Sequence, residues 1–90
     1  MQGWRIVYSD KAVTDLKTLD RSLRRQIFAR LEWFVTNFSD LDPIPLHGDW
    51  KGYFKFRIAD WRVIYDYNTT SRTIRVHQIN RRDKVYKKRR

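Results

Sequence analysis

An apolar stripe along residues 21–38 constrains the fold of this 90-residue chain more than any other feature. Leu23, Ile27, Leu31 and Phe34 recur at intervals of three and four residues, and arginines occupy many of the positions between them. This spacing places the apolar side chains on one face of an α-helix. Such a helix is stable only when another element covers that face, so the stripe predicts a sheet packed against it.

Strand patterns lie on both sides of this helix in the sequence. Residues 4–8, 53–58, 61–67 and 73–79 are rich in β-branched and aromatic residues, as strands are. A shorter helical pattern connects the first strand to the stripe. The sequence therefore predicts an α+β fold, with an N-terminal strand, a two-helix hairpin and a three-stranded antiparallel meander that completes a four-stranded sheet. One domain is expected to span residues 1–90.

Three breaks separate the predicted elements, and the last of them is a turn from Asn68 to Arg72. Residues 39–50 contain Pro43 and Pro45 and predict an irregular connection from the helices to the sheet. Ala59 and Asp60 form a two-residue break between strands, which is typical of a hairpin although the usual glycine is missing.

Composition narrows the class of protein. The chain has no cysteine, which excludes disulfides and thiolate metal sites. No run approaches the roughly 18 apolar residues of a membrane span, and the N-terminus lacks the apolar core of a signal peptide. A cytoplasmic protein with no metal and no membrane association is expected.

The net charge of +10 is confined to the last forty residues. Residues 1–50 carry equal numbers of basic and acidic side chains, whereas residues 51–90 carry thirteen basic and three acidic ones. A surplus of this size favours nucleic acid first, then an anionic membrane surface or an acidic protein. It also favours a dedicated acidic partner that covers the basic surface when the protein is idle.

The basic side chains lie within predicted strands. Lys55 and Arg57 alternate with Phe54 and Phe56 and therefore share one face of their strand. The next strand has apolar residues on both faces, so the place of Arg62 beside them is inferred from the hairpin alone. The end of the last strand is expected to bring three further side chains to the same neighbourhood. These are Arg81, Arg82 and Tyr86.

Two segments carry a resemblance to a known family. Residues 56–65 read FRIADWRVIY, and residues 82–86 read RDKVY. With Gly52 and Tyr53 they resemble the RelE-like toxins of type II toxin–antitoxin systems, within the RelE/ParE superfamily. The resemblance covers the whole chain and implies a RelE-like fold.

The resemblance also implies an activity and partners. RelE-like toxins are endoribonucleases that cleave messenger RNA in the ribosomal A site without metal or cofactor, by attack of a 2′-hydroxyl on the adjacent phosphate. A cognate antitoxin inhibits them, and the toxin–antitoxin complex binds operator DNA. The implied partners are thus an antitoxin, the ribosome with its message, and operator DNA.

Five catalytic residues follow from the resemblance, residue by residue. Lys55 is the expected base, because neighbouring arginines favour the neutral amine and Arg57 cannot give up its proton. Arg62 is expected to clamp the phosphate, and Arg82 to stabilise the leaving oxygen. Tyr86 is expected to stack on a base, although a tyrosine near a chain end packs against the sheet equally often.

Further basic residues are expected to bind RNA without taking part in the reaction. Their attraction to phosphates should weaken steeply as salt rises. They are Arg75, Arg81, Lys84, Lys87 and Lys88.

Two other functions fit the same residues. ParE-like toxins share the scaffold and bind DNA gyrase without catalysis, and a plain RNA-binding module would use the same aromatic and basic side chains. His47 and His77 are far apart in the sequence with no cysteine near either, which is poor support for a metal site.

Overall fold

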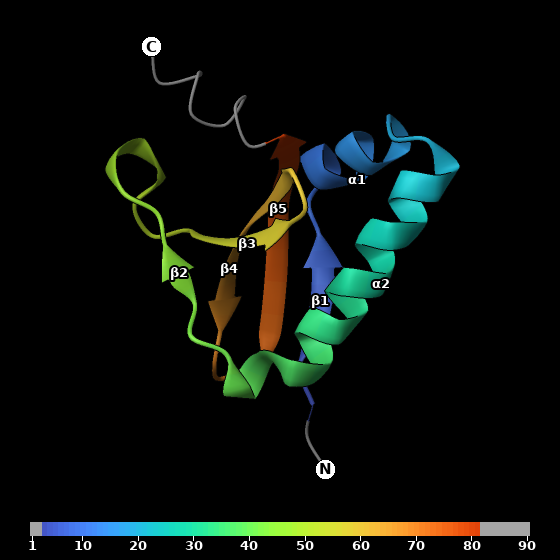
Figure 1. Cartoon of the computed structure of the whole chain (residues 1–90). Coiled ribbons are helices and arrows are strands. Elements are labelled where there is room, and N and C mark those ends of the chain that lie inside the picture. Colours follow the sequence, from blue (N-terminus) through green and yellow to red (C-terminus); the bar gives the residue numbers. More distant parts are fainter. Residues whose placement is uncertain (1–2, 82–90) are drawn as a thin grey trace.

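The computed structural model describes residues 3–81 of the chain as two helices and a five-stranded sheet (Figure 1). Two short 3-10 turns occupy Phe38–Asp40 and Gly48–Trp50. The elements in chain order are β1 (Arg5–Tyr8), α1 (Asp10–Lys17), α2 (Arg21–Asn37), β2 (Ile44–Pro45), β3 (Phe54–Ile58), β4 (Trp61–Asn68) and β5 (Thr73–Arg81).

The predicted α+β class and element order are confirmed, with two corrections to the sheet. The strand order is β1-β5-β4-β3-β2, and β1 runs parallel to β5, whereas every other pair is antiparallel. The sheet is therefore mixed, because the two helices carry the chain away from β1 before the meander begins. The fifth strand, β2, was missed within the predicted irregular connection. It contains Pro45, which an edge strand tolerates because one side of it needs no hydrogen bonds.

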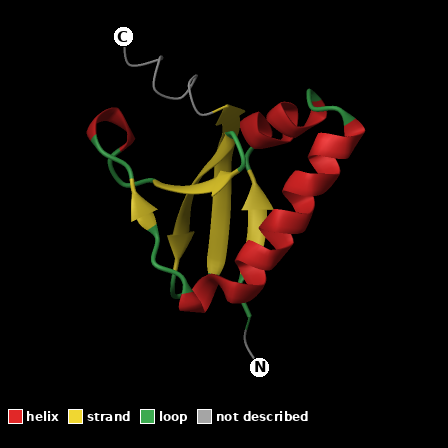
Figure 2. Cartoon of the chain, viewed as in Figure 1, coloured by secondary structure: helices red, strands yellow, loops and turns green. Residues whose placement is uncertain are grey.

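Both helices begin at the capping residues that the sequence offers. Ser9 Oγ accepts a hydrogen bond from Ala12 N at 3.1 Å, and Asp20 Oδ1 accepts one from Leu23 N at 2.8 Å. Each side chain thus satisfies a backbone N–H that has no partner inside its helix. Figure 2 shows the two helices together on one side of the molecule and the Gly48–Trp50 turn at the opposite side.

The predicted stripe of α2 forms the centre of the core. Phe34 is 2% exposed, and its ring lies 4.1 Å from that of Phe56 on β3 and 5.1 Å from that of Tyr65 on β4, centroid to centroid. A buried aromatic ring of this kind contributes about 3–5 kcal/mol relative to alanine. The packing therefore fixes which face of β3 and β4 turns toward the helices. Neither described helix is both long and apolar enough to cross a membrane.

Candidate functional site

Alternation along β3 directs its cations away from the helices. Phe54, Phe56 and Ile58 belong to the core, and successive side chains of a strand point to opposite faces. Lys55 and Arg57 therefore lie on the other face, which we call the open face. Lys55 is half-buried there and Arg57 is exposed.

The ladder between β3 and β4 places Arg62 on the same face. Arg57 lies directly opposite Arg62, and residues opposite one another in an antiparallel pair point to one face with Cβ atoms about 4.5–5.5 Å apart. Lys55 is the diagonal neighbour of Arg62, at about 7–8 Å. The register resolves what the sequence left open, because Val63 and Tyr65 fill the core face of β4. Arg62 is only 4% exposed, so its surroundings restrict its guanidinium.

A β-bulge in β5 determines which side chains of β5 lie beside Arg62 on the open face. Ile64 pairs with Gln78, but the next residue, Tyr65, pairs with Val76, so His77 is an extra residue on β5. A bulge shifts the alternation by one residue. As a result, Val76 before the bulge and Ile79 after it both face the core, although they are three residues apart.

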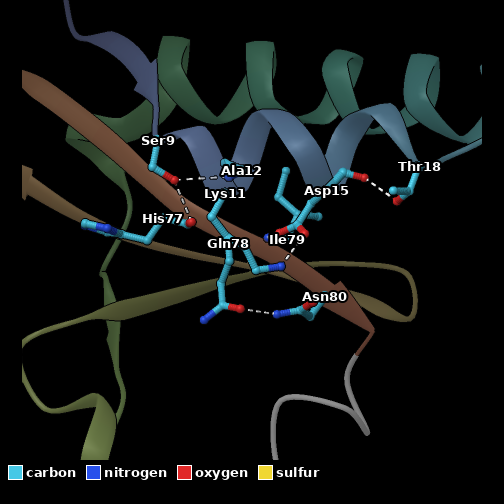
Figure 3. A network of polar contacts seen from close by, with 9 residues as sticks. All are labelled: Ser9, Lys11, Ala12, Asp15, Thr18, His77, Gln78, Ile79 and Asn80. Atoms are coloured by element: carbon cyan, nitrogen blue, oxygen red, sulfur yellow. Dashed lines mark hydrogen bonds and ion pairs between the residues drawn. The ribbon is translucent and has the colours of Figure 1, made fainter.

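Two amide side chains enter the open face after this bulge. Asn80 lies opposite Arg62 in the ladder, and its side-chain amide donates a hydrogen bond to the side-chain oxygen of Gln78. Both project from the side of β5 opposite α1 (Figure 3). Sequence reasoning missed both residues. The available signal was Ile79, which breaks the alternation that Ile74 begins.

Helix α1 holds the part of β5 that carries these amides. β1 pairs with β5 only as far as Val76, and beyond it no strand borders that edge within the described part of the chain. Side chains of α1 and of its N-cap residue hydrogen-bond the β5 backbone there instead (Figure 3). Ser9 Oγ donates to the His77 carbonyl oxygen at 2.7 Å, and Asp15 Oδ2 accepts from Ile79 N at 2.8 Å.

Replacing Asp15 with alanine is expected to lower the free energy of unfolding by about 1.5–3 kcal/mol. The substitution removes the acceptor of the Ile79 amide and the ion pair with Lys11, whose Nζ lies 2.5 Å from Asp15 Oδ1. Urea unfolding measures the loss. Asp42→Ala, at an exposed loop position, should change stability by less than about 0.5 kcal/mol, and equal effects of the two substitutions would contradict this account.

A second small core divides the open face. Leu46 and Ile64 are buried against each other, and Trp50 and Tyr53 pack on them. Gly52, at φ +95°, allows the chain to turn back before Tyr53, because that backbone region is rarely accessible to other residues. The cations lie at the end of the face near the β3–β4 turn, and a separate polar area lies near the β4–β5 turn.

The other predicted residues do not all join the cluster. Arg75 is exposed near the β4–β5 turn and lies opposite Asp66. Arg81 lies opposite Trp61, with its guanidinium carbon 6.0 Å from the Trp61 ring centroid. Alternation thus directs Arg81 away from the open face, contrary to the expectation that it joins Lys55. The following predicted residues lie outside the described part of the chain: Arg82, Lys84, Tyr86, Lys87 and Lys88.

Two tyrosines outside the cluster have a shifted pKa, and neither adds a proton acceptor to it. Burial, with a smaller contribution from Tyr67, raises the pKa of Tyr65, and burial also raises the pKa of Tyr8. Both phenols therefore stay neutral, and both pack in the core. Among residues 3–81, no three His, Cys, Asp or Glu side chains gather where they could hold a metal ion.

The arrangement suits an anionic group with trigonal or tetrahedral oxygens. Guanidinium groups bind phosphate through paired N–H donors, and an ammonium adds a compact charge. Lys55, Arg57 and Arg62 supply both kinds from adjacent strands of one sheet. A cluster of these three cations can bind a phosphodiester and stabilise extra negative charge that forms on it.

Comparison with known proteins identifies a family for this chain. A family model described as "ParE toxin of type II toxin-antitoxin system, parDE" matches residues 6–86. No curated protein matches the sequence.

Several solved structures share the fold. The toxin–antitoxin complex RelBE2 from Mycobacterium tuberculosis superposes with a TM-score of 0.71 at 18% identity, covering 90% of this chain and 100% of that one. The isolated E. coli RelE toxin gives 0.70 at 16% identity, over 96% and 94% of the two chains. YafQ from E. coli gives 0.64 at 21% identity, over 90% and 96%. At these identities the likeness concerns the fold alone.

Proposed function

We propose that this chain, which belongs to the ParE toxin family of type II toxin–antitoxin systems, is a metal-independent endoribonuclease that cleaves messenger RNA in the ribosomal A site. The observation that supports this activity most is the cluster of Lys55, Arg57 and Arg62 on one face of the sheet. The solved structures of RelE and YafQ reported above have the same fold as this chain. The toxin acts in the cytoplasm and needs no cofactor.

The proposed reaction uses the message itself as the nucleophile. Lys55 takes the proton of a 2′-hydroxyl, and the resulting oxygen attacks the adjacent phosphorus. Arg57 and Arg62 stabilise the charge that collects on the phosphate oxygens. The bond to the 5′-oxygen then breaks, and that oxygen takes up a proton from water. The products are a 2′,3′-cyclic phosphate and a 5′-hydroxyl.

Two further roles rest on the family resemblance. Arg82 assists the departing 5′-oxygen, and Tyr86 stacks on a base beside the cleaved bond. Both residues lie outside the described part of the chain. We retain them as proposals.

A cognate antitoxin is the proposed inhibitor, and the complex is proposed to bind operator DNA. Solved complexes of the same fold contain a RelB antitoxin with its RelE toxin. In this chain an apolar groove of about 390 Å³ lies between β1 and α2, lined by Ile6, Tyr8, Phe28, Leu31 and Val35 among others. β1 is also an edge strand of the sheet, which leaves its outer backbone groups for another chain.

We assign this groove to an amphipathic, acidic segment of the antitoxin. Phe28 is 43% exposed at its rim, so its ring offers a large apolar contact to a segment that enters the groove. The exposed arginines Arg21 and Arg25 precede Phe28 on α2, and Glu32, in the lining of the groove, is the single acidic residue of this helix. An acidic partner is therefore attracted to the surface that surrounds the groove.

Phe28→Asp is expected to weaken antitoxin binding about 30-fold or more, as removal of a central aromatic contact does. Calorimetric titration of the purified toxin with its antitoxin measures the change. Val13→Asp is the matched control, because Val13 is similarly exposed, at 39%, but is not part of the groove. An equal loss in both variants, or none in Phe28→Asp, would assign the antitoxin to another surface.

Gyrase binding is the second candidate, because the matching family is that of ParE toxins. A gyrase-binding toxin has no need of a cluster that stabilises a reacting phosphate, which is why we place it second. Expression of the toxin in growing cells separates the two. The proposed activity predicts cut messages with 2′,3′-cyclic phosphate ends, whereas uncut messages with accumulated gyrase–DNA cleavage complexes would establish the second function.

A further inference from the structure

A second polar groove lies on the open face, at the end near the β4–β5 turn. It has a volume of about 420 Å³, and its lining includes Arg5, Asp66, Asn68, Ser71, Thr73 and Arg75. Neither the proposed reaction nor the antitoxin groove uses these residues. Two of them are arginines, which is the residue type best suited to phosphate.

The two arginines come from neighbouring strands and point to the same side. Val7 pairs with Arg75, and Arg5 pairs with Thr73, in the parallel ladder between β1 and β5. Arg5 Nε donates to Thr73 Oγ1 at 3.1 Å, which orients the guanidinium along the groove. Arg75 is exposed and is therefore accessible to a ligand.

The acidic residue of the groove lies beside a histidine. Asp66 Oδ2 lies 3.2 Å from His77 Nε2, and His77 packs edge-on against Tyr53, with ring centroids 4.7 Å apart. The carboxylate therefore sits at the inner end of the groove, toward the small core that contains Tyr53. Asp66 also lies opposite Arg75 in the ladder, so its charge weakens the attraction of a phosphate to Arg75 more than the attraction to Arg5 on β1.

The groove lies in line with the proposed reaction site. Arg62 and Asp66 project to the same face of β4, four residues apart, which is about 13 Å along a strand. Stacked nucleotides rise about 3.4 Å each along one strand. A single strand held at Arg62 would reach the groove after about four nucleotides, having passed the small core beside Tyr53.

The geometry points to this groove as a second RNA subsite, in which Arg5 and Arg75 each bind a backbone phosphate of a single strand that extends from the reaction site. The inference rests on the proposed action on RNA. The message supplies that strand, and ribosomal RNA, which presents the same backbone, is the other source that the test distinguishes.

The test compares Arg5→Gln/Arg75→Gln with a matched double variant, Arg21→Gln/Arg25→Gln, which removes the same charge from exposed positions on α2. Fluorescence anisotropy with a labelled, non-cleavable 2′-O-methyl RNA of sixteen nucleotides gives the Kd at a series of salt concentrations. Loss of two phosphate contacts should raise the Kd at least tenfold relative to the control variant. It should also reduce the slope of log K against log salt by about 1.4, at 0.7 per phosphate.

Binding to vacant ribosomes without message forms the second arm. A loss of affinity for the oligonucleotide assigns the groove to the message, and a tenfold loss for vacant ribosomes alone assigns it to ribosomal RNA. Unchanged binding in both arms, relative to the control variant, would overturn the subsite. A wild-type protein that binds RNA through this groove but leaves messages intact would overturn the proposed reaction and not the subsite.

Discussion

Arg62→Ala is expected to slow single-turnover cleavage of messages on programmed ribosomes by about 100- to 1,000-fold, the usual cost of removing one preorganised donor to a developing charge. The effect should be large because Arg62 occupies the centre of the cluster, opposite Arg57 on one side and Asn80 on the other. Its burial, with 4% exposed, restricts the guanidinium before substrate arrives. Little reorganisation is then needed as the phosphate becomes more negative.

Two further variants separate catalysis from folding. Arg62→Met preserves much of the buried volume and removes the guanidinium with its charge and N–H donors, so it should lose as much activity as Arg62→Ala with a smaller change in Tm. Arg25→Ala removes a positive charge from an exposed position on α2 and should leave the cleavage rate within about twofold. A rate for Arg62→Met close to that of the unmodified protein would exclude Arg62 from the reaction.

Lys55→Arg is expected to be as inactive as Lys55→Ala, with both slower than the unmodified protein by about 100-fold or more. Arginine preserves the positive charge on the open face but does not release its proton at any pH near neutrality. The pair of variants therefore distinguishes a base from a purely electrostatic role. The comparison uses rapid-quench measurements at saturating ribosome concentration, so that weaker binding does not lower the rate.

The same pair of variants can also contradict the proposed role of Lys55 as a base. If Lys55 acts only through its charge, Lys55→Arg should restore most of the rate that Lys55→Ala loses. Lys51→Ala serves as the control, because Lys51 is an exposed lysine in the loop before β3. Full activity in Lys55→Ala would remove the proposed base altogether.

Much of the fold could be predicted from local patterns. The stripe of α2 and the caps Ser9 and Asp20 depend on spacing within one helix, and the structure has them where the sequence places them. The parallel alignment of β1 with β5 could not be predicted in this way, because it depends on contacts between residues about 70 positions apart. β2 could not be predicted because it has only two residues and one of them is a proline.

The residues of the site were likewise predictable where they depend on local patterns and not where they depend on strand pairing. Lys55 and Arg57 follow from simple alternation with Phe54 and Phe56, so their shared face was predictable. The face of Arg62 was not, because both faces of β4 carry apolar side chains and only the ladder distinguishes them. Sequence reasoning missed the amides that follow the bulge in β5, and it expected Arg81 beside Lys55, whereas Arg81 lies next to Trp61.

The most direct test of the proposed reaction replaces one hydroxyl of the message. The cleavage position is first mapped on a programmed ribosome with the unmodified toxin, and the message is then synthesised with a 2′-deoxy nucleotide on the 5′ side of the cleaved bond. The proposed reaction predicts a 2′,3′-cyclic phosphate on the normal message and no cleavage of the deoxy message, since the nucleophile is missing. Cleavage of the deoxy message at an unchanged rate would contradict it.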